Sequence, residues 1–336
     1  MVVLTAERLV KLAYYYPSLY NNWYILASSA LAVVNQPQEI GKVFHFALKQ
    51  QLLEASLVDK PLLTDPFMLK LAEDSIASAL KYDEFTAIGI NLPDILVPYS
   101  YHDKLPVPFK YNRSEDIHAA QSAVANRMRE AILKVAPIAG LPKSINALTA
   151  LRKVTPNSIR PDLKPRRPCV LTPGHVASSD LVQEDFAGTR FESDIIPTYD
   201  TMEGPVSVEL VNPRIILDNT VRGSDLWLVI YGKIGTRVKN QMYNAYPDLW
   251  QYAYNNVYGP LLSYTEIISA KETSFVVVSA LIPQDVNPTL KGHLKGALNQ
   301  GATKEEIESV CSLTFDLCDW SGNDFWKNAK ESVAKL

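Results

Sequence analysis

Cysteine is scarce in this sequence of 336 residues, which contains three: Cys169, Cys311 and Cys318. An odd and sparse set excludes the disulfide framework of a small secreted protein and indicates a reducing compartment. On one helix, Cys311 and Cys318 would stand ~10 Å apart along the axis, whereas a disulfide needs Cα atoms within ~7 Å. The sequence therefore predicts two buried core thiols there. Cys169 lies in a proline-rich segment with no neighbouring group that would activate it.

Long apolar runs are also missing. The most apolar stretches, residues 27–34 and 275–282, fall short of the ~20 residues that a membrane-spanning helix needs. The N-terminal "MVVLTAERLVKL" has no basic region followed by an apolar run and a small-residue cleavage site. We therefore expect a soluble protein without a signal peptide.

A surplus of positive charge is absent as well. The chain has 33 Lys and Arg against 36 Asp and Glu, a formal net charge of −3. A nucleic-acid-binding protein would need a clustered basic face. The one basic cluster, Lys164 with Arg166 and Arg167, stands among prolines and predicts an exposed linker.

Motifs for metals and nucleotides are missing too. His102, His118 and His175 have no metal-ligand spacing to other His, Cys or acidic residues. There is no Gly-Lys-Ser/Thr phosphate loop, and Gly232 with Gly235 do not make a dinucleotide fingerprint. The sequence predicts neither a metal site nor a cofactor.

Helical patterning is what the sequence does contain. Apolar residues recur at spacings of three and four in several segments. Thr303 and Glu306 have the form of a capping box, and Gly301 suits the left-handed end of the preceding helix. Ser114 marks a second helix start and Pro142 a third.

The segment from about residue 154 to 225 has a different composition. Its first part, "VTPNSIRPDLKPRRP", is proline-rich and polar and predicts a linker or surface crossing. Its later part, "VSVELVNPRIILDN", is rich in β-branched residues and predicts a short strand pair. Helical patterning resumes at about residue 226.

Two segments far apart in the chain resemble one another. "LASSALAVVNQPQEIGKVFHFALKQ" and "FVVVSALIPQDVNPTLKGHLKGALNQ" each have a small apolar helix, then Pro-Gln, then a helix bearing a histidine. The histidines are His45 and His293. The interval from Pro37 to His45 is shorter than that from Pro283 to His293, so a chance similarity between amphipathic helices is the alternative to an internal repeat.

The stretch "HLKGALNQGATKEEI" resembles the signature of the carboxymuconolactone decarboxylase and alkylhydroperoxidase D superfamily, and "IAGLPKSINALTAL" resembles its helix-break segment. The resemblance implies an all-α fold of helical hairpins packed into a bundle. It implies two repeats, over residues 1–153 and 226–336, joined by an irregular or β-containing connector over 154–225. It also implies a homo-oligomer.

The resemblance further shows what is missing from the expected site. Peroxidases of the superfamily carry Cys-x-x-Cys before the histidine-bearing helix, and "PQDVNP" stands there in this chain. Disulfide-based peroxide reduction is therefore excluded at this place. The positions that match the superfamily's proton relay are Glu272 and His293, since a carboxylate can orient an imidazole that acts as a base. The alternative is an ordinary first-turn acid and a polar residue on a lysine-rich face.

Further residues are candidates for the same site as Glu272 and His293. Lys291 and Asn299 would line the same pocket, and Tyr231 and Arg237 are candidate anion-binding residues, with a solvated basic face as the alternative. In the first repeat, the place equivalent to Glu272 is occupied by Leu26, so the resemblance implies a degenerate, structural N-terminal half.

The sequence ends with Ala334, Lys335 and Leu336. This tripeptide resembles the small-basic-leucine signal that the peroxisomal import receptor reads at a C-terminus. It predicts a protein of the peroxisomal matrix, and a frayed helix end that matches by chance is the alternative.

Three functional hypotheses follow. The first is a cofactor-free lyase or isomerase that moves protons on a small carboxylate or lactone through Glu272 and His293. The second is a non-catalytic peroxisomal protein that binds a partner or metabolite. The third is an antioxidant peroxidase that uses Cys169 or the core cysteines.

Overall fold

The computed structural model describes residues 2–50, 66–95, 117–161, 166–168, 198–201, 204–207, 211–323 and 326–336. Five residues singled out above, namely His102, Ser114, Lys164, Cys169 and His175, lie outside these ranges. The chain forms two compact units. Unit 1 comprises Met1–Arg160, Val229–Lys233 and Thr265–Leu336, and unit 2 comprises Pro161–Leu228 and Ile234–Tyr264.

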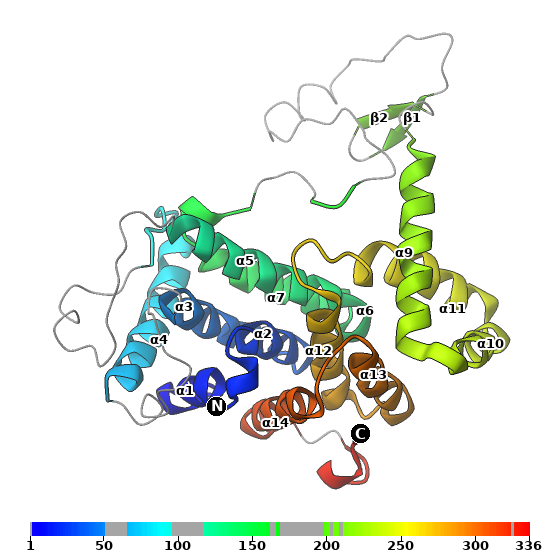
Figure 1. Cartoon of the computed structure of the whole chain (residues 1–336). Helices are drawn as coiled ribbons and strands as arrows, with labels where there is room; N and C mark the ends of the chain where they lie inside the picture. The colour runs from blue at the N-terminus through cyan, green and yellow to red at the C-terminus, as the bar shows by residue number, and fades with distance from the viewer. Residues whose placement is uncertain are drawn as a thin grey trace. The chain divides into compact units, whose positions relative to one another are not determined.

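Unit 1 is a helical bundle (Figure 1). Its α-helices are α1 (Ala6–Tyr14), α2 (Trp23–Val33), α3 (Ile40–Gln50), α4 (Pro66–Ala87), α5 (Ile117–Lys134), α6 (Ala136–Ala139), α7 (Leu141–Lys153), α12 (Ala270–Leu281), α13 (Asn287–Asn299) and α14 (Lys304–Trp320). Its 3-10 turns are η1 (Pro17–Leu19), η2 (Pro37–Glu39), η5 (Asn157–Ile159), η9 (Ile282–Gln284) and η10 (Lys330–Ser332). The predicted all-α fold is therefore confirmed.

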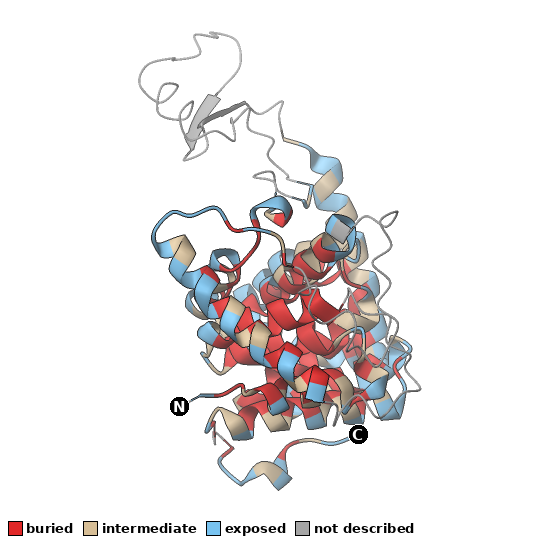
Figure 2. Ribbon diagram, turned by 90° about the vertical axis from the view of Figure 1, so that its left-hand side faces the viewer, coloured by how far each residue is buried: buried red, intermediate tan, exposed pale blue. Residues whose placement is uncertain are grey.

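Two hairpins of the same kind lie in the middle of unit 1. In the first, η2 joins α2 to α3, and in the second, η9 joins α12 to α13, with a proline in each turn (Pro37 and Pro283). The first helices of the two hairpins pack against each other, and α5 packs against both. All 11 residues of α2 are buried, as expected for a helix that is apolar or small on every side. Figure 2 shows the buried residues gathered inside this bundle.

The predicted helix starts are confirmed where the structure describes them. Thr303 and Glu306 close a complete capping box at α14, and Gly301 has a positive φ of 86°. α7 begins directly after Gly140, whose φ is 90°, and carries Pro142 in its first turn. Local sequence chemistry therefore determines these boundaries.

Unit 2 contains a strand pair, but this pair lies earlier in the chain than the sequence predicts. β1 (Thr198–Thr201) and β2 (Gly204–Ser207) are antiparallel, with Thr198 opposite Ser207. The predicted strand "RIILDN" is instead the beginning of α9 (Pro213–Tyr231). The physical reason is local: Pro213 suits the first helical position, and Asn212 Oδ1 accepts the Arg214 N–H at 3.0 Å. These terminus signals outweigh the β-branched residues that follow.

The last three residues of α9 and the first two of η7 (Gly232–Ile234) belong to unit 1. From Ile234 on, the described part of unit 2 is helical, with α10 (Gly235–Ala245), α11 (Pro247–Tyr252) and a π-helix over Ala253–Leu262. The π-helix crosses α9 closely, because a Cβ on Gly223 would lie 2.7 Å from Gly259 Cα. Arg167, predicted to lie in an exposed linker, donates to the Pro260 carbonyl at 3.1 Å and covers the ring of Tyr264. Within the described ranges, no helix combines the length and apolar character that crossing a bilayer requires.

The two units do not coincide with the two predicted repeats. Both the N-terminal and the C-terminal hairpin belong to unit 1, and most of the predicted connector belongs to unit 2. A division into compact units is a different property from an internal repeat, so the repeat boundaries at residues 153 and 226 stay a prediction.

Candidate functional site

Glu272, one of the two predicted catalytic residues, lies in the first turn of α12 and caps that helix. The Ser269 hydroxyl accepts the Glu272 N–H at 3.2 Å, and Glu272 Oε2 accepts the Ser269 N–H at 2.8 Å. Glu272 Oε1 accepts a hydrogen bond from Arg127 of α5 at 2.5 Å. Both carboxylate oxygens therefore have partners that stabilise the fold, as the alternative interpretation of a first-turn acid expects.

Arg127 links α5 to the beginnings of α2 and α12. Its guanidinium donates to the Asn21 carbonyl at 2.9 Å, to Asn22 Oδ1 at 2.8 Å and to the Tyr24 hydroxyl. It also lies 5.3 Å from the centroid of the Tyr24 ring, a cation–π contact. Burial raises the pKa of Tyr24 to about 12, although the positive charge of Arg127 acts in the opposite direction. The cluster is a structural junction between three helices.

His293, the other predicted catalytic residue, is buried on α13 with 6% of its surface exposed. Desolvation lowers its pKa to about 4, so the imidazole is neutral at pH 7. Its Nε2 lies 3.4 Å from the Tyr231 hydroxyl, and the two rings meet edge to face with centroids 5.9 Å apart. Among the described residues, no carboxylate bonds this ring, so Glu272 and His293 do not form the hydrogen bond that the resemblance implies.

Close packing against α13 brings Tyr231 to the histidine. A Cβ on Gly296 would lie 2.8 Å from Ile230 Cγ2, so only glycine allows the chain to approach this closely. Asn299 Nδ2 donates to the carbonyl of Val229 at 2.9 Å. Three predicted residues therefore belong to one cluster: Tyr231, His293 and Asn299. Asn299 contributes by a hydrogen bond to the backbone two residues before Tyr231.

The two predicted basic residues occupy exposed positions on their helices. Lys291 is exposed on α13, and Arg237 is exposed on α10 in unit 2. Both match the alternative of a solvated basic surface.

His45, on α3 of the first hairpin, is enclosed by hydrogen bonds. Its Nε2 lies 2.8 Å from the Val154 carbonyl and its Nδ1 lies 2.7 Å from Ser78 Oγ. Because a carbonyl can only accept, Nε2 carries the proton and Nδ1 accepts from the serine. Burial lowers the pKa of His45 to about 3, so the ring is a neutral link between α3, α4 and the end of α7.

The cysteines of α14 are poor nucleophiles. Cys318 is buried and Cys311 is half-buried, and both are free thiols, so the predicted pair of core cysteines holds fully for Cys318 only. Desolvation raises the pKa of Cys311 to about 11 and that of Cys318 to about 12. Neither residue is a thiolate at neutral pH, which gives the peroxidase hypothesis no support from this helix.

Sequence reasoning missed a cleft of about 360 Å³ in unit 1. Its lining comes from the turn before α3, from α4 and from the end of α7: Pro37, Gln38, Gly41, Lys42, Ala79, Leu80, Asp83, Asn146, Thr149, Ala150, Lys153 and Val154. Gly41, Ala79 and Val154 are buried, whereas Asp83 and Lys153 are exposed and lie 3.7 Å apart. No local motif could reveal it, because three helices distant in sequence each contribute small residues.

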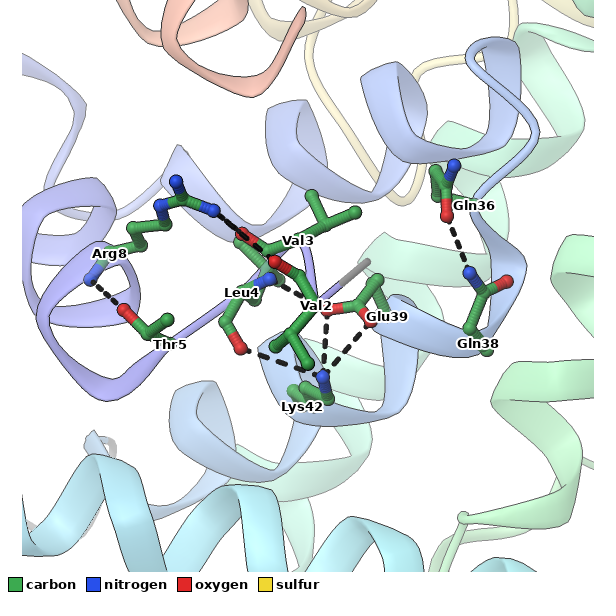
Figure 3. Close-up of polar contacts among 9 residues, drawn as sticks. All are labelled: Val2, Val3, Leu4, Thr5, Arg8, Gln36, Gln38, Glu39 and Lys42. Atoms are coloured by element: carbon green, nitrogen blue, oxygen red, sulfur yellow. Dashed lines mark hydrogen bonds and ion pairs between the residues drawn. The ribbon is translucent and has the colours of Figure 1, made fainter. Parts of the chain in front are cut away.

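Lys42, which also lines the cleft, has its charge paired with a buried carboxylate. Its Nζ donates to both carboxylate oxygens of Glu39, at 3.0 and 2.8 Å, and Glu39 also accepts the Leu4 N–H at 2.8 Å (Figure 3). Lys42 and Glu39 are both buried, so this ion pair holds the first residues of the chain against α3. The charged groups that remain at the cleft are Lys153 and Asp83.

Comparisons with known proteins agree with this architecture. Residues 248–322 match the model of the carboxymuconolactone decarboxylase family. The chain is 35% identical to peroxisomal protein 2 of Saccharomyces cerevisiae over 335 residues, covering 99% of each chain. It is 33% identical to peroxisomal protein 2 of Schizosaccharomyces pombe over 199 residues, covering 59% of this chain and 72% of the relative. No solved structure matches the chain.

Proposed function

Because this chain belongs to the carboxymuconolactone decarboxylase family, as a full-length homologue of the yeast peroxisomal protein 2, we propose that it is a binding protein for a small metabolite. It is a peroxisomal protein. The proposal concerns what it does there: it binds a small organic acid in the cleft of unit 1, and Glu272 and His293 stabilise the fold.

The observation that carries this proposal is that Glu272 and His293, the two expected catalytic residues, contact different partners and not each other. Glu272 has Arg127 on one oxygen and the Ser269 N–H on the other. His293 is buried, neutral and in contact with Tyr231. A general base works best when its pKa is near the working pH. The pKa of His293, about 4, is well below neutral pH.

The chemistry of the cleft favours a ligand with an apolar body and an anionic end. Gly41, Ala79 and Val154 provide a buried apolar surface. The ammonium group of Lys153 is half-exposed and pairs loosely with Asp83, at 3.7 Å. An exposed ion pair of this kind contributes little energy, so Lys153 is available to a carboxylate that enters the cleft.

Calorimetric titration of the purified full chain with linear C4–C8 monocarboxylates and the matching lactones tests this proposal. We expect binding that Lys153→Ala weakens and that Ala150→Phe, which fills the cleft, abolishes. Lys295→Ala is the matched control, because Lys295 is exposed on α13 away from the cleft. Binding that is unchanged in Ala150→Phe, or no binding at all, would overturn the assignment.

A second function, proton transfer on a small carboxylate or lactone, is favoured by one contact. The half-exposed Tyr231 lies 3.4 Å from His293 Nε2, so a tyrosine backed by a neutral histidine stands where a Glu–His relay was expected. Turnover of the same compounds that falls in both His293→Gln and Tyr231→Phe would establish this function and displace the binding role. Turnover unaffected by either substitution would exclude this pair.

We also propose that the terminal Ala334, Lys335 and Leu336 carry the chain into the peroxisomal matrix through the import receptor. The support is their small-basic-leucine pattern and the exposure of Lys335 and Leu336. The homo-oligomer that the family resemblance implies stays a prediction, to be checked by measuring the molar mass in solution.

A further inference from the structure

The last residues of the chain are bound to the turn of the second hairpin. Trp326 is 6% exposed, donates from its indole N–H to the Ile282 carbonyl at 2.8 Å and packs edge to face on Phe315. The Lys327 N–H donates to Asp285 Oδ2 at 3.3 Å. These contacts hold the start of the C-terminal segment, residues 326–336, against η9 and α14.

A single side chain, that of Asn287, holds the other end of this segment. Its Nδ2 donates to the Ser332 carbonyl at 3.0 Å, and its Oδ1 accepts the Ala334 N–H at 2.7 Å. Between these two bonds Val333 is buried, with 4% of its surface exposed. Asn287 is the first residue of α13 and therefore clamps the segment at the beginning of the second hairpin's histidine-bearing helix.

The clamp reaches into the proposed import signal. Ala334 is the first residue of the tripeptide, and its N–H is occupied by Asn287. A receptor that captures a C-terminal carboxylate needs access to the end of the peptide. To reach the Ala334 N–H or the Val333 side chain as well, it would have to displace Asn287 first.

We propose that the α12–α13 turn and the import receptor compete for the C-terminal segment, so that the folded chain presents its signal only after Asn287 releases it. This inference rests on the proposed import role of the tripeptide. The intramolecular clamp consists of two hydrogen bonds and one buried valine, which is a modest energy. Competition should therefore lower the apparent affinity for the receptor by about tenfold rather than abolish binding.

The test compares the folded chain with a free peptide of residues 326–336. Fluorescence anisotropy competition measures the affinity of each for the tripeptide-binding domain of the import receptor. We expect the wild-type chain to bind about tenfold more weakly than the peptide, and Asn287→Ala to remove the difference. Asn244→Ala, at an exposed position on α10, is the matched control and should bind like the wild type.

A second variant distinguishes release of the C-terminal segment from a loss of folding. Asn287→Asp keeps an acceptor for the Ala334 N–H and removes the donor to the Ser332 carbonyl, so it should have an intermediate affinity. Hydrogen exchange at the Ala334 amide should be protected in the wild type and fast in Asn287→Ala. Equal affinities for wild-type chain and peptide would overturn the clamp while leaving the import role intact. A peptide that does not bind the receptor would remove both proposals.

Discussion

Glu272 stabilises two structures at once, because each of its carboxylate oxygens has a partner of its own. Oε2 completes the cap of α12, and Oε1 holds Arg127, which in turn contacts the beginning of α2. The side chain is about one fifth exposed, so its ion pair is partly shielded from water. This residue therefore matters for stability whether or not it takes part in chemistry.

Replacing Glu272 by alanine should lower the free energy of unfolding by about 1–3 kcal/mol, the sum of a lost cap interaction and a partly buried ion pair. Urea unfolding at pH 7 measures the change. Glu305→Ala is the matched control, since Glu305 is also an acid in the first turn of a helix but is not the cap partner. A loss for Glu272→Ala no larger than that for Glu305→Ala would contradict the structural role.

His293 should make the protein sensitive to mild acid. Its pKa is about 4 in the folded chain and near 6.5 when unfolded, so below about pH 6.5 the unfolded state binds more protons. The stabilising contribution is complete above pH 6.5 and is lost as the pH falls towards 4. Through this residue, the free energy of unfolding should fall by about 2 kcal/mol between pH 7 and pH 5.

Urea unfolding of wild type and His293→Gln at several values between pH 5 and 7 isolates this effect. The variant should have the shallower dependence on pH, because it cannot bind the proton. His45, whose pKa is lowered to about 3, titrates equally in both proteins and cancels in the comparison. Parallel pH profiles would show that His293 is not protonated on unfolding in this range.

The sequence contained part of this information about single residues. Ser269 and Glu272 have the same Ser/Thr-x-x-Glu spacing as Thr303 and Glu306, so the cap at α12 was as readable as the cap at α14. The Arg127 partner was not, because it lies 145 residues away in the chain. The burial of His293 was hidden too, since α13 carries exposed lysines around it.

At the scale of elements, two glycines of α13 make a matched pair. Both lie inside the helix, where alanine is favoured over glycine by up to about 1 kcal/mol. A Cβ on Gly292 would lie 3.4 Å from the Tyr231 ring, an ordinary contact, whereas one on Gly296 would lie 2.8 Å from Ile230 Cγ2. Gly296 therefore permits the close approach that places Tyr231 beside His293.

Gly296→Ala should destabilise the protein by about 1–3 kcal/mol through overpacking, while Gly292→Ala should be neutral or stabilising by less than about 1 kcal/mol. Thermal and urea unfolding of the two variants measure the difference directly. Equal effects of the two substitutions would mean that the segment 229–231 does not pack on α13 in this way.

Element boundaries followed from the sequence wherever a cap or a proline defined them. α14, α7 and the two hairpins were predictable for this reason, and α9 would have been, had the signal of Asn212 and Pro213 been weighed above the β-branched residues after it. The cleft was not predictable, because helix–helix spacing and not local propensity creates it. Its small residues, such as Gly41 and Ala150, have no distinctive pattern along the chain.

At the scale of the whole molecule, the proposed import signal predicts that localisation depends on Leu336. Removing Leu336 from an N-terminally labelled chain should leave the protein in the cytosol, because the terminal tripeptide is no longer complete. Fluorescence microscopy against a peroxisomal marker measures this. Lys335→Arg, which keeps the small-basic-leucine pattern, is the control and should remain peroxisomal. An unchanged pattern after the deletion would argue against the tripeptide, or for carriage by a partner.

Because unit 2 is inserted within the sequence of unit 1, helices that pack together in unit 1 are synthesised far apart in time. α2 is completed at residue 33, yet α12, one of the helices that pack on it, begins at residue 270, which is 237 residues later (270 − 33). At about 5–20 residues per second, translation leaves the side of α2 that α12 covers without this partner for roughly 10 to 50 seconds. Every newly made copy therefore exposes this apolar side of α2 while it is still on the ribosome. The length of the exposure is set by the rate of synthesis and not by how fast the hairpins fold.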